Sequence, residues 1–377
     1  MPLTIGVLKE SASHEARVAL TPEIATKLIE LGATILIENG AGTRSNFPDA
    51  AYRGAQFHAS PAEVLAGAQV LLKVQPPSVA EIEQLRTGAV VVGFMQAHRE
   101  LPAVRLLRDR KVTSFATELI PRISRAQSMD ALSSQAAAAG YKAALLAANA
   151  LDKFFPMLTT AAGTIRPAQV LVIGAGVAGL QAIATARRLG AIVEAYDVRA
   201  ATKEQIQSLG ARFVDTGVAA EGSGGYAREL TEEEKAKQQA ILDQHIARAD
   251  AVITTAAIPG RTAPRIISKA AVEAMGAGAV IVDLAAESGG NCELTVPGET
   301  VVTPNGVKIL GPRNLPSELA RNASQMYARN LLNFLQPAIK NGELDIDWHD
   351  EVFAQSVLTH DGQVRHAGTA KLLGEGA

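Results

Sequence analysis

The 377-residue chain contains a single cysteine, Cys292, which excludes an internal disulfide. Its formal net charge is only −2, so charge gives no argument for binding nucleic acid or an anionic membrane. The first residues, MPLTIGVLKESASHEAR, lack the basic region and apolar run of a secretory signal. We therefore expect a cytoplasmic protein that has no nucleic-acid partner.

Common catalytic signatures are absent as well. The chain has no HExxH pair, no paired-cysteine zinc spacing and no G-x-S-x-G turn, so no metal site is expected. Among the histidines, only His98 comes just after a predicted strand. It could serve as a general acid–base, but a surface histidine at the start of a loop is the simpler interpretation.

The composition that remains is typical of a large globular protein. Apolar residues make up 47% of the chain and charged residues 20%, and the length favours two domains. The longest nearly apolar window, residues 169–186, has the length of a membrane span. Three glycines at turn spacing interrupt it, which favours a strand, a turn and a helix instead.

Short apolar runs alternate with amphipathic segments along the chain, which predicts α/β domains with parallel sheets covered on both faces. A helix is predicted to be capped by Thr21, to begin at Pro22 and to stop at Gly32. The first strands are expected in LTIGVLKE, ATILIENG, AQVLLKVQ, AVVVGFM and VTSFATE, with a helix in LPAVRLLRDRK. Later strands are expected in QVLVIGAG, IVEAYDV, ARFVDT, DAVITTA, AVIVDLA and VKILGP, with helices at 177–189, 200–209, 231–248 and 268–276.

Two long helices are expected to connect the domains. One is the alanine-rich stretch 134–153, whose only turn signal is Gly140, and the other covers residues 317–336. The resulting division is a first domain of residues 1–133 and 337–377 and a second domain of residues 154–316. The polar C-terminal tail gives no clear pattern.

The turn GAGVAG lies between a predicted strand and a predicted helix. Gly174 permits the tight turn, Gly176 leaves room for a pyrophosphate, and Gly179 lets the helix press on the strand. Free N–H groups at the start of the helix favour negative charge. The next strand ends at Asp197, about 20 residues beyond Gly176, where an acid can bind a ribose hydroxyl. This pattern predicts a dinucleotide site rather than a structural turn with a solvated aspartate.

Asp197 would repel a 2′-phosphate, which favours NAD over NADP, although Arg199 could accept that phosphate. The loops 253–260 and 282–292 follow strands at the edge where ligands approach an open parallel sheet. The segment AAEGSGGYAREL could be a flap that places Tyr226 over a cofactor, or an ordinary surface loop. The expected dinucleotide contacts are Gly174, Gly176, Val177, Ala178, Gly179, Asp197, Val198, Gly225, Tyr226, Thr255 and Ala256.

The loop PRISRAQSMD, residues 121–130, is charged but contains no obvious nucleophile, base or metal ligand. Gln127 could hold a carboxamide or a ribose hydroxyl, while Arg122 and Asp130 could pair and keep the loop rigid. The alternative is a capped connector, because Ser128 or Asp130 ahead of a helix is ordinary N-cap chemistry. Elsewhere, Arg17 and Lys73 could each bind a carboxylate, but a solvated cation is the simpler interpretation of either.

A complete cofactor pattern without a proton acceptor is informative. Oxidising an alcohol or an amine requires a group that takes a proton. Passing hydride from one nicotinamide ring to another requires only that the two rings be held in contact and kept dry. The residues therefore favour transfer between two nucleotides, and they leave open a self-contained dehydrogenase or a non-catalytic NAD-sensing module.

These stretches together resemble the NAD(H)-binding component, domain I, of proton-translocating nicotinamide nucleotide transhydrogenase over essentially the whole chain. The resemblance rests on PRISRAQSMDALSSQ, TTAAGTIRPAQVLVIGAGVAGLQAIATARRLGA, YDVRAATKEQ, GGYARE and VDLAAESGGNC. It implies two Rossmann-like domains separated by a cleft, assembled as a homodimer. It also implies that the loop with Arg122, Gln127, Asp130 and, just beyond, Ser133 contacts the nicotinamide end of NAD(H) and orients hydride transfer.

The resemblance implies further partners. NADP(H) would be bound by a separate subunit, and a membrane-embedded subunit would couple hydride transfer to proton movement. This chain would then be attached peripherally to the cytoplasmic membrane through those subunits.

Alanine dehydrogenase is in the same superfamily, and Arg17 and Lys73 resemble its pyruvate-binding pair. Its catalytic histidine would fall near Met95 and Gln96, and its catalytic aspartate near Glu287. These changed residues count against amino-acid oxidation and agree with the missing base.

Overall fold

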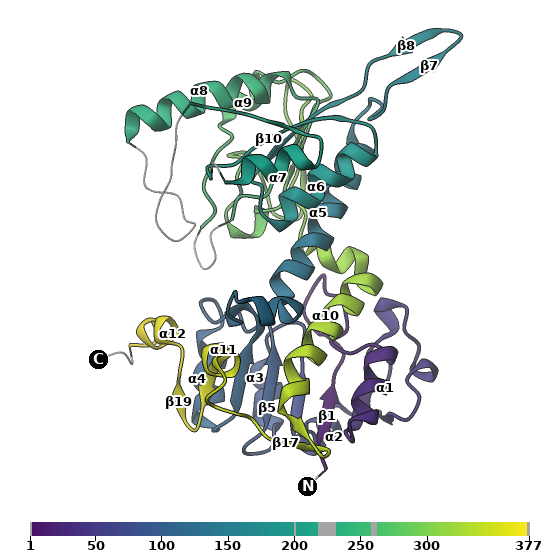
Figure 1. The fold of residues 1–377 in the computed structure, drawn as a ribbon, viewed down its shortest axis with the longest axis vertical. Coiled ribbons are helices and arrows are strands. Elements are labelled where there is room, and N and C mark those ends of the chain that lie inside the picture. Colours follow the sequence, from purple (N-terminus) through teal and green to yellow (C-terminus); the bar gives the residue numbers. More distant parts are fainter. Residues whose placement is uncertain (1, 200, 218–230, 258–261, 375–377) are drawn as a thin grey trace. The chain divides into compact units, whose positions relative to one another are not determined.

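The computed structural model describes residues 2–199, 201–217, 231–257 and 262–374, so Gly225 and Tyr226 lie outside the described residues. The chain divides into two compact units, which Figure 1 shows as a ribbon. Unit 1 contains Met1–Gln135 and Ser317–Ala377, and unit 2 contains Ala136–Pro316. Within the described ranges, no helix combines the length and the apolar character that crossing a membrane requires.

Unit 1 is built on an eight-stranded sheet with the order β19-β18-β6-β5-β4-β1-β2-β3. Its strands are β1 (Thr4–Val7), β2 (Thr34–Glu38), β3 (Gln56–His58), β4 (Val70–Leu72), β5 (Val90–Gly93), β6 (Thr113–Ala116), β18 (Val357–His360) and β19 (Gln363–Val364). Strands β1 to β6 pair in parallel, and β18 and β19 extend one edge in antiparallel fashion. The strand order reverses between β1 and β4, so the carboxyl ends of these two strands form the switch point of the sheet.

Helices cover both faces of this sheet. The first core cluster contains residues of α1, α10 and α11, and the second contains residues of α2, α3 and α4. The helices of unit 1 are α1 (Pro22–Glu30), α2 (Pro61–Gly67), α3 (Val79–Gln84), α4 (Leu101–Asp109), α10 (Ala320–Leu335), α11 (Glu351–Ser356) and α12 (Ala367–Leu372). Shorter elements are η1 (Thr43–Ser45), η2 (Asp49–Ala51), η3 (Thr117–Leu119), η4 (Ser124–Met129), η8 (Gln336–Ala338), β16 (Ile339–Lys340) and β17 (Glu343–Leu344).

Unit 2 has a seven-stranded sheet with the order β11-β10-β9-β12-β13-β15-β14, in which only β14 is antiparallel. The strands are β9 (Gln169–Ile173), β10 (Ile192–Tyr196), β11 (Arg212–Phe213), β12 (Ala251–Thr254), β13 (Val280–Asp283), β14 (Thr300–Val302) and β15 (Lys308–Leu310). The helices are α5 (Ala131–Ala150), which begins in unit 1, and α6 (Val177–Arg188), α7 (Thr202–Ser208), α8 (Glu232–Arg248) and α9 (Lys269–Glu273). Two short 3-10 helices are η6 (Ala286–Ser288) and η7 (Leu315–Leu319), the second of which ends in unit 1. Here the order reverses between β9 and β12.

The alanines of α5 allow this helix to pack closely in unit 2. Ala143, Ala144 and Ala147 are fully buried in the core that also contains residues of α6 and α7. A Cβ on Gly140 would clash with the carbonyl oxygen of Ala178 at the start of α6. Gly140 is therefore a close-packing position inside a continuous helix and not a turn.

The predicted α/β class, with mainly parallel sheets covered on both faces, is confirmed, and every strand predicted from sequence is present. The short strands β3 and β14 and those of the tail were not predicted, because their few apolar residues did not stand out from the surrounding sequence. Helix α1 begins at Pro22 with Thr21 at its N-cap position, as predicted, but the Thr21 side chain makes no capping hydrogen bond, and its buried hydroxyl has no hydrogen-bond partner among the described residues.

Candidate functional site

The glycine turn follows β9 at the switch point of unit 2. Gly174 has φ +94°, and a Cβ there would lie 2.6 Å from the Thr255 hydroxyl. A Cβ on Gly179 would clash with the Gly174 carbonyl oxygen, whereas one on Gly176 would meet nothing within 4 Å. No side chain caps α6 at its N-cap, Gly176. Within the described residues, space is therefore open beside Gly176 at a helix start without a side-chain cap, which suits a diphosphate.

Asp197 follows β10 and is tied to this turn. Its carboxylate accepts hydrogen bonds from the Ala175 N–H (2.7 Å) and from the Nε (2.9 Å) and Nη2 (3.0 Å) of Arg199. Burial raises the pKa of Asp197, but the hydrogen bonds from Arg199 and Ala175 outweigh it and hold the pKa below its ordinary value. The Arg199 guanidinium is thus paired with Asp197, although 42% of its side chain is exposed.

The loop after β12 lies against the turn. The Thr255 hydroxyl donates to the Gly174 carbonyl at 3.0 Å. The Ala256 N–H donates to the Asn291 side chain at 3.1 Å, and Asn291 returns a hydrogen bond of 2.8 Å to the Ala256 carbonyl. Val177 and Val198 expose their side chains at the start of α6 and directly after Asp197. The structure therefore gathers the described members of the predicted dinucleotide set at one end of one sheet.

Sequence reasoning missed the residue that organises the loop after β13. The fully buried Asp283 accepts hydrogen bonds from the hydroxyls of Thr254 (3.0 Å) and Thr295 (2.7 Å) and from the N–H of Asn291 (2.8 Å). It also accepts from the N–H groups of Ala285 and Cys292, both at 3.0 Å. An aspartate that ends a buried strand could have indicated this role, but its donors come from four different places in the sequence.

The loop of residues 121–130, which was expected to contact the nicotinamide end of NAD(H), contains η4 and belongs to unit 1. Asp130 caps α5 by accepting hydrogen bonds from the Ser133 N–H (2.8 Å) and the Ser133 hydroxyl (2.6 Å). The suggested Arg122–Asp130 pair is wrong for this structure, because Asp130 bonds to the helix start and Arg122 is exposed. Gln127 is exposed as well. The exposed side chains of Arg122 and Gln127 thus belong to a loop that ends at the capping residue Asp130.

Arg17 and Lys73 are buried, so the interpretation of each as a solvated cation is wrong. Arg17 is 4% exposed; its Nε and Nη2 donate to the Glu15 carboxylate (2.8 and 2.7 Å), and its Nη1 donates to Gln135 (2.7 Å). Lys73 is 1% exposed, with its Nζ 3.3 Å from Glu10 and 3.0 Å from Glu81.

These charges lie at the switch point of unit 1, because Glu10 follows β1 and Lys73 follows β4. Burial lowers the pKa of Lys73, but the charges of Glu10 and Glu81 more than offset it, and the pKa is raised. The place where a ligand would approach this sheet is therefore filled by paired side chains of the protein itself. His98, the other candidate of this region, is exposed.

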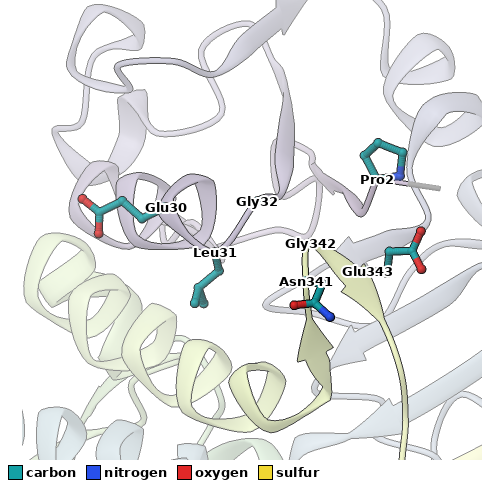
Figure 2. A pocket seen from close by; sticks show the side chains of 7 residues that line it. All are labelled: Pro2, Glu30, Leu31, Gly32, Asn341, Gly342 and Glu343. Atoms are coloured by element: carbon teal, nitrogen blue, oxygen red, sulfur yellow. The ribbon is translucent and has the colours of Figure 1, made fainter.

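Two pockets lie at different places relative to these sites. One, of ≈ 410 Å³, lies at the amino-terminal end of β1, and the side chains of Glu30 and Glu343 point away from each other there (Figure 2). Ligands approach parallel sheets from the opposite end, so it is not a candidate site. The other, of ≈ 210 Å³, lies in unit 2 beyond β13 and β15 and is lined by Ala139, Leu284, Glu287, Pro312, Asn314, Leu315 and Pro316.

The fold and this geometry define a dinucleotide-binding α/β protein with two doubly wound units. The family descriptions "Alanine dehydrogenase/PNT, N-terminal domain" and "Alanine dehydrogenase/PNT, C-terminal domain" match residues 6–139 and 143–367. The chain belongs to this alanine dehydrogenase/PNT family.

Its relatives include both transhydrogenase subunits and alanine dehydrogenases. It is 46% identical over 388 residues to the first part of the NAD(P) transhydrogenase subunit alpha of Rhodospirillum rubrum, with 100% of both chains covered. The structure of a transhydrogenase from Sinorhizobium meliloti matches with a TM-score of 0.87 at 45% identity, covering 96% of this chain and 99% of that one. Alanine dehydrogenase of Halomonas elongata is 27% identical over 380 residues, covering 99% and 97%. The resemblance to transhydrogenase drawn from the sequence is confirmed.

Proposed function

We propose that this chain is the NAD(H)-binding component of a proton-translocating transhydrogenase, and that NADH bound to unit 2 reduces NADP+ on a separate subunit. One observation carries the proposal. The glycine turn and Asp197 lie together at one end of the unit 2 sheet, as expected of a dinucleotide site, while the unit 1 switch point is occupied by the pairs of Arg17 and Lys73 with buried carboxylates. In the part of the chain that the structure describes, unit 2 thus has a place suited to a nucleotide, whereas the corresponding place in unit 1 is occupied by side chains of the protein itself.

The residues that would hold NAD(H) fit the cofactor. The N–H groups of Val177, Ala178 and Gly179 would bind the diphosphate, with space left by Gly176. Asp197 would accept from the adenosine ribose once Arg199 yields one of its contacts. Val198, Thr255 and Ala256 would line the site, as would Gly225 and Tyr226, which lie outside the described residues.

The bound cofactor supplies the hydride, so this chain has to position the nicotinamide ring and to exclude water. Gln127 and Arg122 are exposed on the capped loop and would hold the nicotinamide end, with Asp130 and Ser133 fixing the start of α5 behind them. None of these side chains has to accept a proton for hydride to move between two nicotinamide rings.

Replacing Gln127 by asparagine should therefore slow transfer about 10-fold and leave NADH affinity within about 2-fold, because shortening the side chain shifts only the amide that orients the ring. Single-turnover transfer to a partner-bound NADP+ and NADH titration measure the two quantities. Ser124→Ala, an exposed change in the same loop, is the matched control. An unchanged transfer rate in the asparagine variant would remove the loop from the mechanism.

A homodimer is the assembly we propose, and the hairpin of β7 (Leu158–Thr160) and β8 (Gly163–Ile165) supports it. It extends away from the rest of unit 2 (Figure 1), and all six of its strand residues are exposed. An isolated two-stranded hairpin is only marginally stable in water. Phe154, Met157 and Ile165 expose 51%, 64% and 46% of their surface, which suits a hairpin that packs on a second copy.

Replacing Met157 by aspartate should weaken that dimer at least about 10-fold, because a buried unpaired charge disfavours association. Sedimentation equilibrium of the variant against wild type measures the effect. Val302→Asp, a change at another apolar residue of unit 2 that is 63% exposed, is the control and should leave association unchanged.

The partners we propose are an NADP(H)-binding subunit and a membrane-embedded proton-channel subunit, which would hold this chain on the cytoplasmic side of the membrane. Purified alone, the chain should bind NADH and reduce NAD+ negligibly with L-alanine. Adding the NADP(H)-binding subunit should start transfer. Rapid L-alanine oxidation without a partner would establish the dehydrogenase instead, and binding of the partner without transfer would establish an NAD-sensing module.

A further inference from the structure

The loop that presents Gln127 is held from its buried side by two amides of α10. The side-chain nitrogens of Asn330 and Asn333, one turn apart, both donate to the Ser128 carbonyl at 2.9 Å. Asn330 is 8% exposed, and its amide oxygen accepts from the Ser134 hydroxyl at 2.7 Å. Both the nitrogen and the oxygen of the Asn330 amide are thus hydrogen-bonded, and the C-terminal half of η4 is held against α10.

The other side of the loop is held by Arg125, which pairs with Asp350 and, at 3.8 Å, with Glu351, both far along the chain. Both Nη atoms of Arg125 donate to the carboxylate of Asp350, with Nη1 at 2.9 Å from Oδ2. Asp350 is itself fixed, because it caps α11 by accepting from the Val352 N–H at 2.7 Å. A fork of two parallel hydrogen bonds restricts orientation as well as distance.

This pair is poorly suited to a purely stabilising role. The side chains of Arg125 and Asp350 are 48% and 20% exposed, and exposed ion pairs contribute little to stability. Gln127 lies between the Arg125 anchor and the Ser128 anchor, and its neighbours Ala126 and Met129 are buried in the unit 1 core, so these contacts together set the direction in which its amide extends. Arg122 lies on the N-terminal side of the Arg125 anchor, next to Ile123, which packs against the same core.

We propose that Arg125 and Asp350 are positioning residues, whose contact fixes Gln127 and Arg122 in the geometry that hydride transfer requires. The role in transfer rests on the proposed function; the anchoring of the loop does not. Small misplacements of a positioning group can lower a rate by two orders of magnitude without affecting folding. Loss of the contact should therefore lower the transfer rate and leave NADH affinity and stability largely intact.

The test compares Arg125→Met, Asp350→Asn and the double variant with wild type. Asparagine keeps the cap of α11 while removing the charge, so α11 should stay folded. Trp348, the single tryptophan of the chain, stacks on Phe115 near this contact. Unchanged tryptophan fluorescence in a variant would show that the region keeps its fold. The control is Arg329→Met, which removes an exposed arginine of α10 that pairs with Glu23 at 3.2 Å.

Each full-length variant is combined with the NADP(H)-binding subunit, and single-turnover transfer, NADH affinity and amide exchange of residues 124–130 are measured. We expect each single variant to transfer hydride about 10-fold more slowly, with NADH affinity within about 2-fold. The double variant should be no slower than either single one, because both act through one contact. Amide exchange in the loop should accelerate in all three variants and stay unchanged in the control.

Unchanged transfer in either single variant would overturn the proposal, as would additive losses in the double variant. If wild type shows no transfer with the partner, the proposed function fails, and amide exchange still decides the anchoring. Exchange in residues 124–130 that is the same in Arg125→Met and wild type would then refute the anchor.

Discussion

Replacing Gly179 by alanine should weaken NADH binding at least about 100-fold, because the added Cβ would overlap the Gly174 carbonyl oxygen and lie 3.1 Å from the Thr255 hydroxyl. The backbone atom cannot move aside without pushing α6 off the turn that would bind the diphosphate. Fluorescence titration of NADH with the purified chain measures the loss.

Two other glycines separate local crowding from loss of the site. Gly276→Ala should bind NADH as wild type does, because its Cβ would meet no atom within 4 Å and it lies outside the turn. Gly176→Ala should weaken binding with little change in the unfolding midpoint, because its Cβ meets no protein atom but enters the space proposed for the diphosphate. Wild-type affinity in the Gly179 variant would mean that NADH binds elsewhere.

Replacing Glu15 by alanine should destabilise unit 1 by about 3–5 kcal/mol, because it leaves the Arg17 guanidinium buried without its main partner. Glu15 has a fully buried side chain and accepts from Arg17 and from the Gln75 amide at 2.7 Å. Urea unfolding measures the change.

The control for this prediction is Glu23→Gln, which removes an exposed carboxylate that pairs with Lys27 on the same unit. It should cost less than about 1 kcal/mol. A similarly small loss of stability in Glu15→Ala would show that the buried Glu15–Arg17 pair contributes little to the stability of unit 1.

The dinucleotide turn could be predicted because its geometry depends on neighbouring residues. A glycine at φ +94°, a close approach at Gly179 and an acid at the end of the next strand all follow from local sequence. The alternation of strands and helices predicted the class of fold for the same reason. Several very short strands and the hairpin β7–β8 were not predicted, since their few residues form no recognisable apolar pattern.

The burial of Arg17 and Lys73 could not be predicted, because it depends in part on residues that are distant in the sequence. Arg17 meets Gln135 across 118 positions, and Arg125 meets Asp350 across 225. Burial of Lys73 depends on Glu10 reaching it from another strand of the sheet. Sequence alone therefore favoured solvated cations at Arg17 and Lys73, and only the topology shows that both are buried and paired.

The most direct test follows the hydride itself. This chain, its NADP(H)-binding partner, NADP+ and NADH deuterated at the transferred C4 position are mixed in a stopped-flow instrument, and the products are analysed by mass. Direct transfer between the two rings predicts that the deuterium appears in NADPH without loss to water and that no metabolite is needed. Loss of the label to solvent, or turnover of a small metabolite by the isolated chain that depends on one ionisable side chain, would contradict the account.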